Sequence, residues 1–181
     1  KRFSVWKAGD GTFVREFFGP ATYGALGGQI DPRDPQRMVG QGCEWRLDPQ
    51  TGRSTCLGAL TRHGMGASRF GFGPNGRLYL AVTPTMLGTG PVWMFERLGD
   101  ANYKLRATLR RVEKTGPQTN KKTQVTEVWS DANDDAKEQP EEVKTCDLEL
   151  GGWFQGWYMS MTPDLTFYGS RYQVKVTGWT A

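Results

Sequence analysis

Oxygen-bearing groups recur between residues 131 and 142 at a spacing that suits a metal ion. Read from Asp131 as position 1, the segment has Asn at position 3, Asp at position 5 and Glu at position 12, which is the ligand spacing of an EF-hand loop. Calcium takes six to eight oxygens, and alternate positions of a tight loop converge on one point. The predicted ligands are the side chains of Asp131, Asn133, Asp135 and Glu142, the backbone carbonyl of Lys137, and Gln139 through its amide oxygen or a held water. The sequence therefore predicts Ca²⁺ as a cofactor.

The segments around this loop differ from those of a helix-loop-helix. Residues 124–129 alternate β-branched or aromatic with polar side chains and predict a strand, and Pro140 is expected to open a short helical turn. Position 6, usually Gly, is Ala136, which must adopt a left-handed or strained conformation at a cost of about 1 kcal/mol. The alternative interpretation is a solvated acidic loop that joins two strands without a metal.

The composition favours a chain made of many short strands. The 181 residues include 24 Gly and seven Trp, whereas Ala and Leu are too sparse for long amphipathic helices. We therefore expect an all-β fold in a single module over residues 1–181, with the calcium loop as an insert at 131–142. The formal charge of +4 is mild and predicts no nucleic-acid partner, and no apolar run is long enough to predict a membrane span.

Four tryptophans mark similar units along the chain. Trp6, Trp45, Trp93 and Trp129 each lie in a strand-like run that is followed by a turn and a returning polar segment. Their separations are 45 − 6 = 39, 93 − 45 = 48 and 129 − 93 = 36 residues. Periods near 40 residues with apolar spacing of two are typical of β-propeller blades. The prediction is thus about four blade-like antiparallel sheets, forming a partial propeller.

The strands that build these units can be placed from their turns. The segment 48–52, Asp-Pro-Gln-Thr-Gly, and the segment 74–76, Pro-Asn-Gly, are strong turn signals. The expected hairpins pair residues 2–7 with 12–18, 43–47 with 52–57, 69–73 with 77–83, and 91–97 with 103–112. Further strands are expected at residues 146–150, 156–161, 165–170 and 172–178.

Three segments carry a family resemblance. Residues 11–20 (GTFVREFFGP), 28–35 (GQIDPRDP) and 128–135 (VWSDANDD) resemble segments of large secreted bacterial β-propellers of the NHL-repeat type. In such proteins the Asp-x-Asn-x-Asp insert resembles an EF-hand-like calcium loop, usually with Gly where this chain has Ala136. The resemblance implies a secreted protein, extracellular or periplasmic, and four units imply only part of a propeller. We also expect a processed product or a piece of a longer polypeptide, since the chain has neither an initiator Met nor a signal-like segment.

The three cysteines allow two interpretations. Folding the hairpin about Gln50 brings Cys43 and Cys56 nearly opposite each other, where a cross-strand disulfide is feasible. Two buried free thiols are the alternative. Cys146 would be left unpaired, and no Cys-x-x-Cys suggests a zinc ribbon.

The remaining candidate residues each have a structural explanation as well. His63, the single His, is either an exposed loop residue or a ligand or acid-base group shared with another chain. Trp153 and Trp157 either pack between sheets or stack on sugar rings. A basic run could attract phosphate, but its interleaved Leu and Val residues predict an edge strand with a charged outer face. That run contains Arg106, Arg110, Arg111, Lys114, Lys121 and Lys122.

Catalytic motifs are missing from the sequence, so no catalytic residue is predicted. It contains no Gly-x-Ser-x-Gly, Walker loop or dinucleotide fingerprint, and one His excludes a multi-histidine metal centre within this chain. The predicted function is a calcium-stabilised scaffold or interaction module whose partner is another protein chain or the rest of a longer polypeptide. The alternatives are a non-catalytic or site-sharing subunit of a multi-chain enzyme (redox or hydrolase), and a carbohydrate-binding module.

Overall fold

The computed structural model describes residues 2–18, 28–40, 42–60, 67–83, 90–115, 122–146, 160–168 and 173–178. Within these ranges the chain is built of antiparallel strands, and the single helical element is the 3₁₀ turn η1 (Pro140–Glu142). In chain order the strands are β1 (Arg2–Trp6), β2 (Phe13–Phe18), β3 (Gln29–Asp31), β4 (Asp34–Gly40), β5 (Cys43–Leu47), β6 (Ser54–Ala59), β7 (Ser68–Phe72), β8 (Leu78–Val82), β9 (Val92–Gly99), β10 (Asn102–Thr115), β11 (Lys122–Ser130), β12 (Val143–Cys146), β13 (Thr166–Tyr168) and β14 (Gln173–Lys175). The all-β prediction is confirmed, and none of the described helical residues forms a segment long and apolar enough to cross a membrane.

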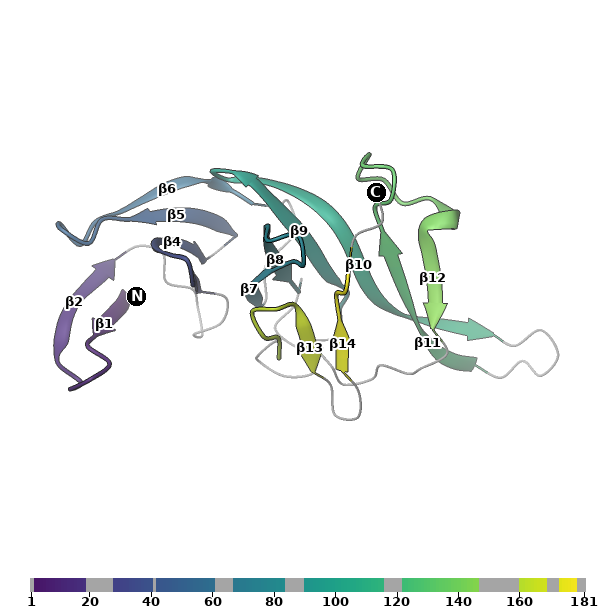
Figure 1. Cartoon of the computed structure of the whole chain (residues 1–181), viewed down its shortest axis with the longest axis horizontal. Helices are drawn as coiled ribbons and strands as arrows, with labels where there is room; N and C mark the ends of the chain where they lie inside the picture. Colours follow the sequence, from purple (N-terminus) through teal and green to yellow (C-terminus); the bar gives the residue numbers. More distant parts are fainter. Residues whose placement is uncertain are drawn as a thin grey trace.

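Three of the four sheets follow one another along an elongated molecule (Figure 1). The hairpin β1–β2 lies at one end, next to the four-stranded meander β3-β4-β5-β6. The largest sheet has the order β12-β11-β10-β9-β8-β7, so each of its strands pairs with its neighbours in sequence. The short hairpin β13–β14 forms the fourth sheet and lies against the middle of the largest one (Figure 1).

Both faces of the six-stranded sheet are covered by apolar side chains. On one face Met94, Leu109 and neighbouring residues pack with Leu165 and Phe167 from the β13 region. On the other face Leu80 and Val82 pack with Val39 of β4, which joins this sheet to the four-stranded one. Alternating side chains of one strand therefore serve two separate cores, as the period of two requires.

The grouping of strands differs from a row of four equivalent blades. The sheets have two, six, two and four strands, and none of them closes on itself within the described residues, so a propeller is not confirmed. Trp93 and Trp129 lie in the same sheet, because Thr108 of β10 pairs with both of them. The expectation that each of these tryptophans marks its own blade is wrong for this pair.

The basic run was expected to form an edge strand, and this expectation is wrong. β10 lies between β9 and β11 and is paired along most of its length. Its arginines are tolerated there because acidic residues on neighbouring segments neutralise them. Arg110, for example, donates to Glu127 of β11 at 2.9 Å and to Glu138 at 2.6 Å.

Candidate functional site

The predicted calcium loop leaves the sheet at the end of β11. Asp131, its first position, donates its backbone N–H to the carbonyl of Arg106 on β10 at 2.9 Å. The β9–β10 register shifts between Leu105 and Ala107, so Arg106 is the extra residue of a β-bulge. Bulges re-aim side chains, and this one turns Arg106 toward both the loop and Glu96 of β9.

Side-chain oxygens at alternate positions hold the loop together from inside. Asp131 Oδ1 accepts from Ala136 N at 3.1 Å, Asn133 Oδ1 from Asp135 N at 3.1 Å, and Asp135 Oδ1 from Lys137 N at 2.8 Å. Each bond uses one oxygen of the side chain to fix the backbone two to five residues onward. The turn is therefore formed by the same side chains that were predicted as ligands at positions 1, 3 and 5.

The backbone adopts an unfavourable conformation at the sixth position of the loop, Ala136. Ala136 has φ of 57° and Asp134 has φ of 68°, both in the left-handed region. The left-handed conformation predicted for Ala136 is confirmed. It costs an L-residue about 1–2 kcal/mol, which the hydrogen bonds within the loop must outweigh.

Glu142, the last predicted ligand, closes the loop from η1. Its Oε2 accepts from the indole Nε1 of Trp129 at 2.7 Å, and its Oε1 accepts from Ala132 N at 2.8 Å and Asn133 N at 3.3 Å. Burial acts to raise the pKa of this carboxyl, but these hydrogen bonds outweigh burial and hold the pKa below its ordinary value. Glu142 is thus ionised at neutral pH, and it ties the two ends of the loop to β11.

Two basic side chains of β10 reach over the loop. Arg106 Nη1 lies 3.1 Å from Asp131 Oδ2 and also contacts Asp134, while Lys104 Nζ lies 3.0 Å from Asp134 Oδ2. Hydrogen bonds from Arg106 and Lys104 lower the pKa of Asp134. Asp134 stands at position 4, which supplies no ligand in the predicted pattern, so its role here is to hold these two cations.

The predicted ligands are of the type that calcium binds, but their carboxylates do not converge on one point. All the predicted donors are oxygens, as calcium prefers, and Gln139 Oε1 is buried without a hydrogen-bond partner among the described residues. Gln139 Nε2 in turn donates to Asp135 Oδ2 at 2.8 Å. No group of three or more His, Cys, Asp or Glu side chains in the described ranges is arranged to hold a metal ion. The loop thus forms the predicted turn, while its carboxylates do not surround a common point in the described structure.

The two cysteines of the β5–β6 hairpin lie on neighbouring strands, two residue pairs apart rather than directly opposite each other. In the β5–β6 register Trp45 faces Cys56 and Cys43 faces Ala59. Both thiols are free in the structure, and burial, with a contribution from the neighbouring Cys56, raises the pKa of Cys43. The disulfide between Cys43 and Cys56 stays a prediction. His63, Trp153 and Trp157 lie outside the described residues.

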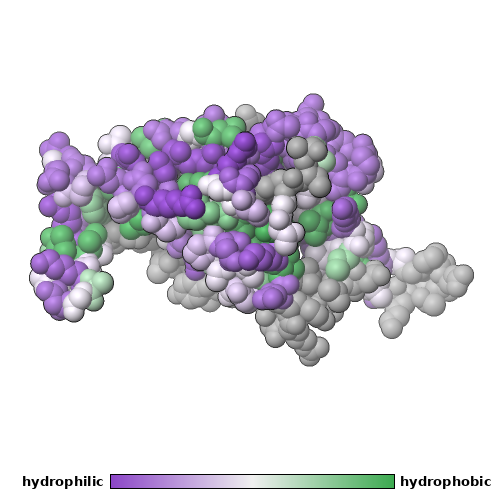
Figure 2. Space-filling model, viewed as in Figure 1, coloured by the Kyte–Doolittle hydropathy of each residue, from purple (hydrophilic) through white to green (hydrophobic). Residues whose placement is uncertain are grey.

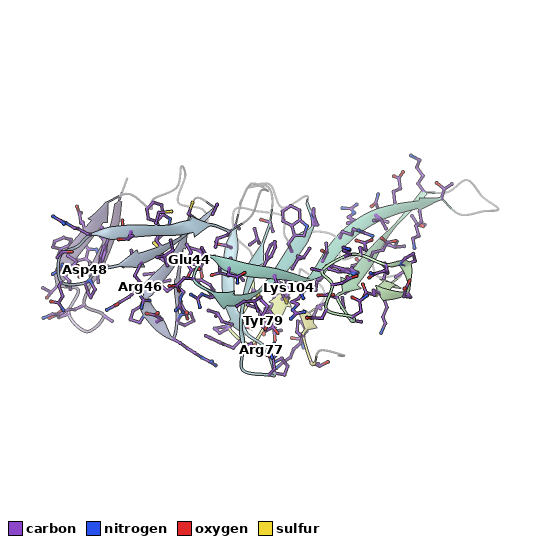
Figure 3. The ribbon with its side chains drawn as sticks, turned by 90° about the horizontal axis from the view of Figure 1, so that it is seen from above. Glu44, Arg46, Asp48, Arg77, Tyr79 and Lys104 are labelled. Atoms are coloured by element: carbon purple, nitrogen blue, oxygen red, sulfur yellow. The ribbon has the colours of Figure 1, made fainter. Side chains whose placement is uncertain are left out.

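A second cluster of charges joins the two large sheets, and the sequence reading missed it. Glu44 of β5 is fully buried and accepts from Arg97 Nε and Nη2 of β9, at 3.1 Å and 3.0 Å. Its other oxygen accepts from the backbone N–H of Ala101 at 2.8 Å, and Arg37 Nε lies 3.2 Å from Oε1. Figure 3 shows Glu44 where the four-stranded sheet meets the β9–β10 hairpin. In the sequence, Glu44 and Arg97 lie in strands at positions where polar residues usually face solvent, so the pattern did not indicate that they pair in the interior.

Comparison with known proteins adds no family to these observations. A scan against protein-family models matched no family, and searches of curated proteins and of solved structures gave no match. The resemblance to NHL-repeat propellers therefore stays a prediction.

Proposed function

We propose that this chain is a calcium-stabilised, non-catalytic β module that serves as a scaffold for another protein chain. The observation that carries the proposal is the loop at 131–142. Its alternate side chains already form the turn, Ala136 accepts an unfavourable backbone conformation, and Glu142 is anchored at the predicted closing position. A bound cation would stabilise this loop, because calcium would neutralise carboxylates that otherwise repel one another.

Calcium would act here as a structural ion. When bound it supplies positive charge that holds the acidic loop closed against β11. The residues of the chain do the rest: Trp129 orients the Glu142 carboxylate, and the Arg106 carbonyl fixes the start of the loop. A partial propeller of a secreted, extracellular or periplasmic protein is the architecture we propose around it, since the four-stranded meander β3–β6 has the strand number and order of one blade.

Calorimetry with two matched variants tests the calcium site. Asp131→Asn keeps an oxygen for Ala136 N but replaces the other oxygen by an amide nitrogen, which does not ligate calcium. We expect wild type to bind Ca²⁺ and Asp131→Asn to bind at least about tenfold more weakly. Asp134→Asn removes the same charge from the same loop at a position that supplies no ligand, so it should retain binding. Equal heats for all three proteins, or none, would remove the site.

The partner surface that we propose is the N-terminal hairpin. Trp6 is 59% exposed and Phe13 is 47% exposed, and their rings meet edge to face with centroids 5.2 Å apart. Figure 2 shows hydrophobic surface over this hairpin at the left end of the molecule. Exposed aromatic residues that gather on one surface are characteristic of protein interfaces.

Light scattering on the isolated chain tests this surface. We expect self-association that Trp6→Ser weakens, because the polar side chain removes the largest exposed ring of the hairpin. Leu98→Ser is the matched control, since Leu98 is 52% exposed and lies on β9 instead. A stable 20.3 kDa monomer at high concentration would contradict the proposal.

A further inference from the structure

A cleft of about 700 Å³ lies directly beside the calcium loop. Its walls come from the β7–β8 turn, from β8 and β9, from the bulge of β10 and from the first residues of the loop. The polar groups that matter are Asn75, Arg77, Tyr79, Glu96, Arg106 and Asp131. This volume falls within the range of small-molecule sites, which are about 300–1,000 Å³.

Two arginines in this cleft are held in place by one buried carboxylate. Glu96 is only 3% exposed at its side chain, and it accepts from Arg77 Nη1 at 2.6 Å and from Arg106 Nε at 2.6 Å. Arg77, Glu96 and Arg106 have a summed formal charge of +1, and Asp131 and Asp134, which also line the cleft, bring its formal charge to 2 − 3 = −1. Two oriented guanidinium groups are a usual recognition element for an oxyanion, and a divalent cation in the neighbouring loop would make the local charge positive.

Arg77 has side-chain N–H groups that could donate hydrogen bonds to a ligand. Its side chain is 60% exposed, and Glu96 is its single side-chain partner among the described residues. A guanidinium carries five N–H donors in a fixed fork, and Arg77, which lines the cleft, contacts Glu96 through Nη1 alone. Asn75 Nδ2 donates to Tyr79 Oη at 2.9 Å, which fixes a further polar pair on the same wall. Figure 3 shows Arg77 and Tyr79 together in the middle of the molecule, with Lys104 nearby.

Arg106 is shared between this cleft and the calcium loop. Asp131 Oδ1 is used by Ala136 N, so Oδ2 is the oxygen that remains for a cation, and Arg106 Nη1 lies 3.1 Å from it. A cation in the loop competes with Arg106 for Oδ2 and repels its guanidinium. It also changes the charge of the cleft wall, where Asp131 and Asp134 otherwise offset the arginines.

We propose that the cleft binds an oxyanion, a carboxylate or sulfate group on a small molecule, through Arg77 and Arg106, and that calcium in the neighbouring loop strengthens this binding. The regulation by calcium rests on the proposed calcium site, whereas oxyanion binding rests on the cleft alone. By thermodynamic linkage the oxyanion must strengthen calcium binding by the same factor. The calcium loop is then part of a ligand-controlled site as well as a structural clamp.

Titration with two simple oxyanions tests the proposal. Sodium sulfate and sodium glucuronate are titrated by calorimetry into chain freed of calcium by a chelator and into calcium-loaded chain, with sodium chloride at matched ionic strength as the blank. We expect at least one oxyanion to bind about tenfold more tightly to the loaded chain, within the usual range of coupling between sites. Preference for glucuronate identifies a sugar acid as the ligand class, and preference for sulfate identifies an inorganic or sulfate-bearing one.

Two variants separate the cleft from general charge effects. Arg77→Gln removes an exposed guanidinium that touches none of the loop carboxylates in the described structure, so it should weaken oxyanion binding about tenfold and leave calcium binding in place. Arg46→Gln is the control, because Arg46 is also exposed and ion-paired, with Asp34 on the other large sheet. Equal losses in both variants would overturn the inference, as would absence of oxyanion binding to a chain that binds calcium. If calcium itself does not bind, the proposed function fails, and oxyanion binding to the calcium-free chain that Arg77→Gln abolishes would still support the cleft.

Discussion

Replacing Glu44 by Gln is expected to lower the free energy of unfolding by about 3–5 kcal/mol. The buried carboxylate accepts two hydrogen bonds from Arg97 and one from the backbone of Ala101, and Arg37 lies beside it. The amide of Gln removes the charge and leaves these guanidinium groups in a poorly solvated junction between two sheets. Arg37 keeps its ion pairs with Asp31 and Asp34, and Arg97 keeps its contact with Asp100. Removing the one fully buried carboxylate still costs more than the pair contributes, because it leaves an excess of positive charge in the junction. Urea unfolding followed by tryptophan fluorescence measures the change.

Arg46→Gln is the matched control for Glu44→Gln. Arg46 lies on the same strand and pairs with Asp34, but its side chain is 46% exposed. Exposed ion pairs contribute about 0–1 kcal/mol, so the unfolding midpoint should shift little. Comparable shifts for the two variants would show that the Glu44 cluster is no more than a surface network.

Local signals in the sequence placed most of the hairpins. The predicted strand at residues 43–47 is β5, and the turns at 48–52 and 74–76 join strands as expected. Proline, glycine and asparagine fix backbone angles within a few residues, which is why these turns can be found without knowledge of the rest of the chain. The 3₁₀ turn at Pro140 follows from the same kind of local rule.

The grouping of hairpins into sheets was not predictable in this way. Whether β8 continues into β9 as one sheet or begins a new blade depends on hydrogen bonds between strands, and the same alternating pattern suits both outcomes. Trp93 and Trp129 illustrate the difficulty, since each resembles the start of a unit but they share one sheet.

The candidate site also has one part that could be predicted from the sequence and one part that could not. Ligand spacing within one loop is local, so the turn and the left-handed Ala136 could be predicted from residues 131–142. Arg106 could not, because its approach to Asp131 depends on a bulge in a strand 25 residues away in sequence. A β-bulge has no strong single-residue signature when no Gly is present.

Glu142→Gln is expected to abolish calcium binding and to loosen the start of the loop. The carboxylate takes the N–H groups of Ala132 and Asn133 with one oxygen and the Trp129 indole with the other. A neutral amide offers a single oxygen, so it cannot serve both sets of donors and cannot ligate calcium with two oxygens. Hydrogen exchange at the amides of Ala132 and Asn133 should accelerate several-fold, and calorimetry should show no heat with Ca²⁺.

Acid should reproduce part of this effect in the wild type. Hydrogen bonds hold the folded-state pKa of Glu142 below 4.5, its ordinary value, against the opposing effect of burial. The stability that this carboxylate contributes is therefore fully present above pH 4.5 and is lost as the pH falls through the folded-state pKa.

Glu141→Gln is the matched control for the variant Glu142→Gln, because Glu141 is the adjacent residue of the same type but is exposed. If Glu141→Gln loses calcium binding as Glu142→Gln does, the loop acts through its total negative charge, and the twelfth position has no special role as a ligand.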